Sequence, residues 1–341
     1  MKAAILYQGS VDVGEFPDLK PGPGQALVRT QRCGVCASDN HFMRAGHEII
    51  RQAQAFGGSY SGVDLDRPIV MGHEFVGEIV EYGSGSRQPL SIGTLVTSIP
   101  VMMAGHFGII GYHNHVPGGF GEYLLLDENL MMAVPDGMDP DHAAMIEPLA
   151  VGLEHARVGE PQPGEIPVVI GTGAIGLGVI AGLTLAGVET IVAADLDPTR
   201  RAMALTMGAS VAIDPREISP YAPIEGVGRA DLVYECVGKA GLLNEMVLGV
   251  RDGARIVLGG FTLETERLFV GPAQEKKLRI YFARGEEPQD MQLACDAIAD
   301  GRIDVHPWLG DHIGLDGVAA ALEAMVDPSR PVRTIVDPWS P

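Results

Sequence analysis

A chain of 341 residues exceeds what one hydrophobic core usually supports, so we expect two domains. The composition, with 46% hydrophobic and 20% charged residues, is typical of a soluble globular protein. The excess of 44 acidic over 24 basic residues gives a net charge of -20, which repels nucleic-acid phosphates and anionic lipid surfaces. We therefore expect neither nucleic acid nor a membrane as a partner.

Cysteine usage and the first residues favour a reducing compartment. The four cysteines are too few and too scattered for a disulfide framework, and the opening MKAAILYQGS lacks the apolar core of a secretion signal. These features predict a cytoplasmic protein. Residues 168–188 carry no charge and are long enough for a membrane span, but their glycine pattern favours a buried parallel strand and its helix.

The first part of the chain predicts an antiparallel β structure. Residues 1–149 hold short alternating segments, such as QALVRTQ (25–31) and FVGEIVEYG (75–83), broken by Gly and Pro. This pattern is typical of an antiparallel barrel or sandwich.

The pattern changes at about residue 150 and predicts an α/β domain. In residues 150–285, helical stretches alternate with six apolar strands: IPVVI, TIVAA, SVAID, DLVYEC, ARIVLG and LRIYFA. This order predicts a doubly wound parallel sheet with helices on both faces. Residues 286–341 are too short for a third domain and are expected to return to the first one, with two helical segments and a final strand (288–300, 315–327 and 331–337).

The motif GTGAIG, at residues 171–176, follows the strand IPVVI and opens a helix through Ala174 and Ile175. In this context it predicts a dinucleotide-binding loop. Gly171 would allow the tight turn, Gly173 the close approach of a pyrophosphate, and Gly176 the packing of helix on strand. The free N–H groups of the helix N-terminus would bind that pyrophosphate.

The residue at the end of the next strand, Asp195, favours NAD as the dinucleotide. A carboxylate there accepts hydrogen bonds from ribose hydroxyls and repels a 2′-phosphate. Asp197 is interpreted as a helix N-cap that precedes a proline. Arg200 and Arg201 keep NADP open as an alternative, since an arginine can hold the phosphate.

Three further segments, CGVCASDNH (33–41), IVMGHEFVGEIV (69–80) and MIEPLAVGLEH (145–155), contain a thiolate, an imidazole and a carboxylate in Cys36, His73 and Glu147. These are the ligand types of an open, three-residue zinc site. The CxxC alone would also fit half of a zinc ribbon or a redox pair, but no second CxxC accompanies it.

Together these motifs, with PGGFGEY (117–123) and RTIV (333–336), resemble the zinc-containing medium-chain alcohol dehydrogenases, in particular the polyol, secondary-alcohol and butanediol branch. The resemblance covers essentially the whole chain. It implies a GroES-like β-barrel catalytic domain formed from both chain ends and a Rossmann NAD-binding domain between them. Zinc, nicotinamide and a small alcohol or carbonyl substrate would bind between the two domains, and the enzyme would be a homodimer or homotetramer.

The resemblance also assigns the ligands of one catalytic zinc. Cys36 and His73 would be ligands, with Glu147 as the third, as in the polyol branch. Glu74 matches the family carboxylate that completes or exchanges into the coordination shell. Asp39 would orient the ring of His73 by accepting its second N–H. Cys33 is not expected to be a ligand, since three protein groups suffice.

Proton transfer and cofactor contacts follow from the same resemblance. Ser38 would accept the proton of the alcohol and pass it through a cofactor ribose hydroxyl to His41, although a surface role would also explain His41. Ile175 and Val151 would lie near the nicotinamide, and Arg333 would reach the pyrophosphate. Ala37 stands where some relatives carry a His or Arg that grips phosphate.

Two departures from the family concern segments 100–117 and 45–65. The first lacks the four cysteines of a structural zinc lobe, so no structural zinc is expected. Its histidines, His106, His113 and His115, are interpreted as surface residues. A second metal site formed by them is the alternative. The second departure is an insertion, and the apolar residues in part of it have helical spacing. This insertion would shape the substrate entrance or face a partner.

Two other functions were weighed against zinc-dependent alcohol oxidation. A zinc-free NAD(P)H reductase of the same superfold would share GTGAIG but has no need of the three metal ligands. A binding or structural protein would need no proton relay through Ser38 and His41. Neither the alcohol nor the physiological direction follows from the sequence.

Overall fold

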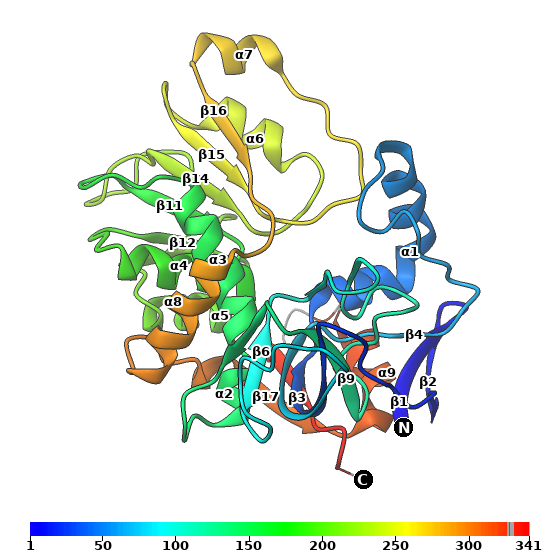
Figure 1. Ribbon diagram of the computed structural model, residues 1–341. Helices are drawn as coiled ribbons and strands as arrows, with labels where there is room; N and C mark the ends of the chain where they lie inside the picture. Colours follow the sequence, from blue (N-terminus) through cyan, green and yellow to red (C-terminus); the bar gives the residue numbers. More distant parts are fainter. Residues whose placement is uncertain (326, 328–330, 341) are drawn as a thin grey trace. The chain divides into compact units, whose positions relative to one another are not determined.

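The computed structural model describes residues 1–325, 327 and 331–340 (Figure 1). The chain forms two compact units: unit 1 comprises Met1–Glu147 and Val305–Pro341, and unit 2 comprises Pro148–Asp304. Segments from both ends of the chain therefore belong to one unit. Among the described residues, no helix has the length and apolar character that crossing a membrane requires.

Unit 1 is built mainly from antiparallel strands, and its largest sheet in the described part of the chain has the order β10-β6-β5-β3-β18-β17, with β9 also pairing with β3. Two small sheets, β2-β1-β4 and β7-β8, complete it. The strands are β1 (Lys2–Tyr7), β2 (Ser10–Glu15), β3 (Gln25–Gly34), β4 (Ile69–Val70), β5 (Glu74–Tyr82), β6 (Leu95–Ser98), β7 (Val101–Met102), β8 (Gly108–Ile109), β9 (Tyr123–Asp127), β10 (Met131–Ala133), β17 (Leu309–Ile313) and β18 (Arg333–Val336).

The C-terminal strand β18 pairs antiparallel with β3, with Ile335 opposite Gly34 and Val336 opposite Cys33. This pairing places the C-terminal strand in the main sheet of unit 1. The helices of unit 1 are α1 (Ala37–Phe56), α2 (Pro140–Ala143), α9 (Val318–Ala324) and the short 3-10 helices η1 (His306–Trp308) and η2 (Leu315–Gly317). The predicted helix over 315–327 is thus shorter, and its residue 326 lies outside the described residues.

Helix α1 begins directly after Cys36 and contains part of the insertion at 45–65. Its start is fixed by Asp39, whose Oδ2 accepts the backbone N–H of Cys36 at 3.0 Å. The backbone bends at Ala45, and the helix ends at Gly57 in the left-handed conformation, which glycine adopts without strain. The prediction that part of this insertion is helical is therefore confirmed.

Unit 2 contains a parallel sheet whose strand order in the described residues is β13-β12-β11-β14-β15-β16. Its strands are β11 (Pro167–Ile170), β12 (Val192–Ala194), β13 (Val211–Ile213), β14 (Leu232–Glu235), β15 (Arg255–Leu258) and β16 (Arg279–Phe282). Its helices are α3 (Ile146–Val158), which starts at the end of unit 1, α4 (Ala174–Leu185), α5 (Pro198–Thr206), α6 (Leu242–Gly249), α7 (Val270–Glu275) and α8 (Pro288–Ala299). The uncharged stretch 168–188 is a buried strand and helix, as expected.

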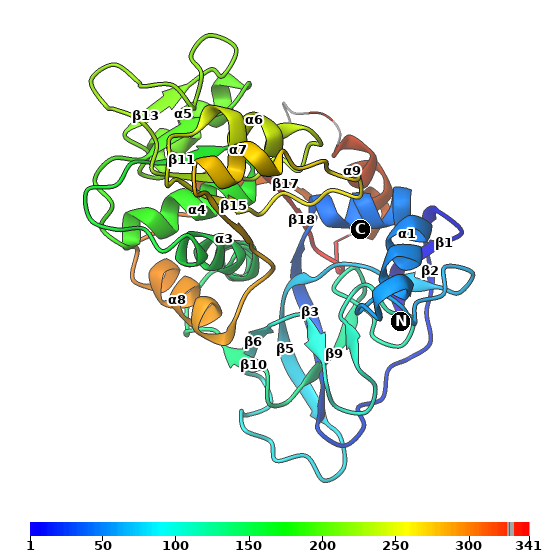
Figure 2. The ribbon, with the colours of Figure 1, turned by 90° about the horizontal axis from the view of Figure 1, so that it is seen from above.

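Helices cover both faces of this sheet (Figure 2). Val233 packs in a core with Met246 and Val247 of α6, whereas the neighbouring Tyr234 donates its hydroxyl to the carbonyl of Ala156 in α3. Since successive strand residues point to opposite faces, α3 and α6 lie on opposite sides of the sheet.

The second boundary differs from the predicted one, because helix α8 belongs to unit 2 and the chain returns to unit 1 only at Val305 rather than at residue 286. Arg157 of α3 contacts α8 within this unit: its guanidinium donates two hydrogen bonds, of 3.1 and 2.9 Å, to Asp290 of α8. The sequence does not reveal that ion pair, since its partners lie far apart along the chain.

Candidate metal and cofactor sites

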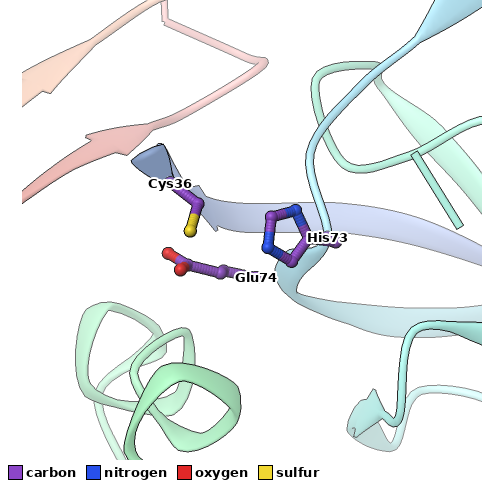
Figure 3. A group of neighbouring side chains, drawn as sticks. All are labelled: Cys36, His73 and Glu74. Carbon is purple, nitrogen blue, oxygen red and sulfur yellow. The ribbon is translucent and has the colours of Figure 1, made fainter. Parts of the chain in front are cut away.

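Pairing of β3 with β5 brings the first candidate site together. Gly34, at the end of β3, lies opposite Glu74, the first residue of β5. Cys36 follows two residues after Gly34, and His73 immediately precedes Glu74. The three side chains therefore converge beside the paired ends of β3 and β5, and Figure 3 shows the Cys36 sulfur facing the Glu74 carboxylate and the His73 ring.

Cys36, His73 and Glu74 each offer one ligand atom, and these atoms all lie within 4.8 Å of one another. Thiolate, imidazole and carboxylate suit zinc and leave a fourth position open. Glu74 Oε2 is buried and has no hydrogen-bond partner in the structure. A buried carboxylate oxygen without a partner is costly, so a cation at this point fits the residues present.

Asp39 lies close to the ring of His73. His73 Nδ1 lies 3.3 Å from Asp39 Oδ1, although the ring N–H does not point straight at the oxygen. Burial lowers the pKa of His73, but the charges of Asp39 and Cys36 outweigh it and hold the pKa well above its usual value. Because Nδ1 faces Asp39, Nε2 is the nitrogen left for a metal.

Arg333 is buried and forms an ion pair with Glu74. Its Nη2 donates to Glu74 Oε1 at 2.7 Å and lies 3.8 Å from the Cys36 sulfur. Burial lowers the pKa of Arg333, but the negative charges of Glu74 and Cys36 raise it above its usual range. A Cβ on Gly34 would collide with Glu74 Oε2, so a side chain at this position would force the carboxylate to shift.

Glu147, the predicted third ligand, is buried at the start of α3 with 6% of its surface exposed. Its charge also contributes to the raised pKa of Arg333. The close group of possible ligands contains Glu74 and does not contain Glu147. Two buried carboxylates therefore neighbour Arg333, and Glu74 is the one beside Cys36 and His73.

The predicted proton-transfer residues lie at the start of α1. Ser38 Oγ is 3.4 Å from His73 Nε2, and His41 stands one turn further along the helix. Partial burial lowers the pKa of His41, which favours its neutral form.

Tyr112 is a site residue that the sequence did not reveal. Its hydroxyl lies 2.9 Å from Ser38 Oγ and 2.8 Å from Asp39 Oδ1, and burial raises its pKa well above the usual value. It belongs to a segment in which only the histidines suggested chemistry. No spacing rule connects a tyrosine there to residues 38 and 39.

In unit 2, the loop GTGAIG has the backbone geometry that its glycines predict. Gly171 has a φ of 83°, a conformation that favours glycine. A Cβ on Gly176 would collide with the carbonyl of Gly171, whereas a Cβ on Gly173 would meet only an Arg200 nitrogen at 3.9 Å. Ala174 and Ile175 form the first turn of α4, and Val151 lies half-buried in α3.

The carboxylate of Asp195 is held at the end of β12. Thr172 donates its backbone N–H and its hydroxyl to Oδ2, at 2.7 and 3.1 Å, and the N–H of Asp197 donates to Oδ1 at 2.9 Å. Asp197 caps α5 by accepting the N–H of Arg200, and Arg201 binds the carbonyl of Asp195. Arg200 Nε is buried without a hydrogen-bond partner.

The three histidines that the sequence offered as a second metal site, His106, His113 and His115, lie together near β8. The ring centroid of His115 is 5.8 Å from that of His106 and 5.6 Å from that of His113. Burial, together with the neighbouring rings, lowers the pKa of His113. Within the described residues, these three do not form a group with ligand atoms as close as those of Cys36, His73 and Glu74.

Comparisons with known proteins agree with both units. The model of the alcohol dehydrogenase GroES-like domain matches residues 22–136, and the zinc-binding dehydrogenase model matches residues 174–300. The chain is 31% identical to (R,R)-butanediol dehydrogenase of Bacillus subtilis, over 72% of this chain and 73% of that protein. It is 27% identical to sorbitol dehydrogenase of the same organism, over 95% and 93% of the two chains.

Among solved structures, a dehydrogenase from Sinorhizobium meliloti bound to NADP superposes with a TM-score of 0.83 and 26% identity, covering 99% of each chain. This likeness confirms the predicted pairing of a GroES-like barrel with a Rossmann domain. The chain belongs to the family of zinc-type, medium-chain alcohol dehydrogenases.

Proposed function

We propose that this alcohol dehydrogenase uses one catalytic zinc and NAD to interconvert secondary alcohols, diols or polyols with their ketones or aldehydes. The buried group of Cys36, His73 and Glu74 is the observation that carries the proposal. The names of the relatives, butanediol dehydrogenase and sorbitol dehydrogenase, support a substrate with more than one hydroxyl group.

Cys36 and His73 would hold the zinc, with Glu74 or Glu147 as the third protein ligand. A bound zinc ion supplies Lewis acidity, which lowers the pKa of a bound water from 15.7 to about 7 and acts on an alcohol hydroxyl in the same sense. Asp39 faces His73 Nδ1 at 3.3 Å, which would leave Nε2 for the metal. Arg333 balances the charge of Glu74.

Ser38 and His41 would carry the alcohol proton away. Ser38 Oγ lies beside His73 Nε2 and would accept the proton there. His41, whose pKa is lowered by partial burial, is neutral at pH 7 and can accept a proton on its way to solvent. Hydride would pass to the nicotinamide, which Ile175 and Val151 would contact.

Asp195 supports NAD over NADP. Its two oxygens are fixed by Thr172 and Asp197, which points a negative charge at the place where the adenosine ribose is expected. A 2′-phosphate would be repelled there. The Sinorhizobium meliloti relative bound to NADP and the unpartnered Nε of Arg200 are the reasons to test NADP alongside NAD.

We also propose a homodimer or homotetramer. In the described part of unit 2, β16 is an edge strand of the parallel sheet, and Phe282 at its end is 79% exposed. An exposed apolar side chain on a sheet edge favours association with a second chain. Light scattering of the purified protein would measure the mass.

The experiment for the proposed function is a panel of primary, secondary, vicinal-diol, polyol and aromatic alcohols with NAD and with NADP, following reduced nicotinamide. We expect the highest kcat/KM for a secondary alcohol, diol or polyol with NAD. Equal activity in metal-free protein would instead indicate the zinc-free reductase.

A further inference from the structure

Tyr112 lies in a buried aromatic cluster of unit 1. Its ring centroid is 4.9 Å from that of Phe42, 5.9 Å from that of Tyr60 and 5.2 Å from that of His73. Only 5% of the residue is exposed. Packing on several sides therefore fixes the direction of the hydroxyl group.

That hydroxyl joins two residues with separate roles. Asp39 Oδ1, at 2.8 Å, is the oxygen that also faces His73 Nδ1, and Ser38 Oγ lies at 2.9 Å. A tyrosine hydroxyl has one proton, and a carboxylate only accepts hydrogen bonds. Tyr112 therefore donates to Asp39, and the hydroxyl of Ser38 donates to Tyr112.

This arrangement determines which way the lone pairs of Ser38 point. Before the alcohol proton arrives, the proton of Ser38 is directed at Tyr112, and Ser38 presents acceptor lone pairs to its other neighbours, among them the region beside His73 Nε2 at 3.4 Å. When Ser38 accepts the alcohol proton, it would turn its own O–H away from Tyr112 and release that proton into the relay. A proton acceptor for an alcohol needs that orientation. The same tyrosine also holds the oxygen of Asp39 that orients the metal-ligand histidine.

We propose that Tyr112 is a positioning residue, which orients Ser38 as a proton acceptor and Asp39 as the partner of His73. The inference rests on the proposed function for its effect on turnover. Its effect on the metal ligand does not require turnover, since groups that orient a ligating histidine change metal affinity by about 10–100-fold.

The test compares Tyr112→Phe with the matched control Tyr82→Phe in the full-length zinc-loaded protein. Both changes remove one hydroxyl group from unit 1, and Tyr82 donates to the carbonyl of Leu90, away from the site. We expect Tyr112→Phe to lower kcat about 10-fold, to change its pH profile, and to leave KM for NAD unchanged. Tyr82→Phe should match the unmodified protein in all three.

The second measurement is zinc affinity, by competition with a chromophoric chelator. We expect Tyr112→Phe to weaken zinc binding about 10-fold, whereas Tyr82→Phe leaves it unchanged. If the unmodified protein oxidises no alcohol, the proposed function fails, and zinc affinity alone then decides the role of Tyr112. Unchanged zinc affinity together with an unchanged kcat and pH profile in Tyr112→Phe would overturn the inference.

Discussion

Arg333 Nη2 donates a hydrogen bond of 2.7 Å to Glu74 Oε1, and both side chains are almost completely buried. The final strand of unit 1 thus supplies the cation that neutralises a carboxylate beside Cys36. By resemblance, Arg333 was expected to reach a cofactor pyrophosphate. Within unit 1, Arg333 instead pairs with Glu74, one of the proposed metal ligands.

Replacing Arg333 should destabilise the protein strongly. Arg333→Met leaves Glu74 buried without its partner, and removing one member of a buried ion pair costs about 3–5 kcal/mol. Urea denaturation of the zinc-free protein would measure the loss. Arg302→Met is the control, because Arg302 pairs with Asp300 on the surface, where such pairs contribute little to stability.

The double change Arg333→Met with Glu74→Gln separates charge from packing. It removes both charges, so we expect part of the stability lost in Arg333→Met to return. A double variant no more stable than the single one would show that the ion pair is not the cause.

Cys36→Ser should remove zinc. We expect zinc content, measured by plasma mass spectrometry, to fall from about one per chain to near zero, with turnover at background, because the thiolate ligand is lost. Cys33→Ala is the matched control, since burial raises the pKa of the Cys33 thiol well above its usual value and disfavours the thiolate. Loss of zinc in Cys33→Ala at normal stability would argue against this ligand assignment.

Sequence motifs predicted the parts of the protein that depend on local chemistry. The six strands of unit 2 and the turn at Gly171 follow from patterns confined to short segments. The convergence of Cys36 with His73 was expected from the family resemblance, and in the structure it depends on the pairing of β3 with β5. The bonds of Tyr112 and of Arg333 do not follow from short patterns, because each depends on side chains brought together by β pairing and packing over long sequence separations. The position of α8 was mispredicted for the same reason.

The pH dependence of alcohol oxidation should report on His41. Burial lowers the pKa of His41 below the ordinary value of 6.5, so the ring is neutral above that pKa and can accept a proton. Activity should fall as the pH drops through it and His41 becomes a cation. His41→Gln should remove this acid limb from the kcat profile between about pH 5 and 9, and an identical limb in the variant would assign it to another group.

Asp195→Asn should shift cofactor preference towards NADP. The amide oxygen can still accept from Thr172, but the charge that repels a 2′-phosphate is gone. We expect the ratio of kcat/KM for NADP to that for NAD to rise at least about tenfold, which corresponds to about 1.4 kcal/mol. Asp300→Asn, a surface change in the same unit, is the control. A clear preference for NADP in the unmodified protein would refute this role of Asp195.

Removal and return of zinc test the central claim most directly. The purified protein is assayed with NAD and its best alcohol before chelation, after dialysis to a metal content near zero, and after one equivalent of zinc is restored. We predict that oxidation disappears with the metal and returns with it, in proportion to zinc bound at Cys36, His73 and a carboxylate. Full activity in the metal-free protein would contradict the account.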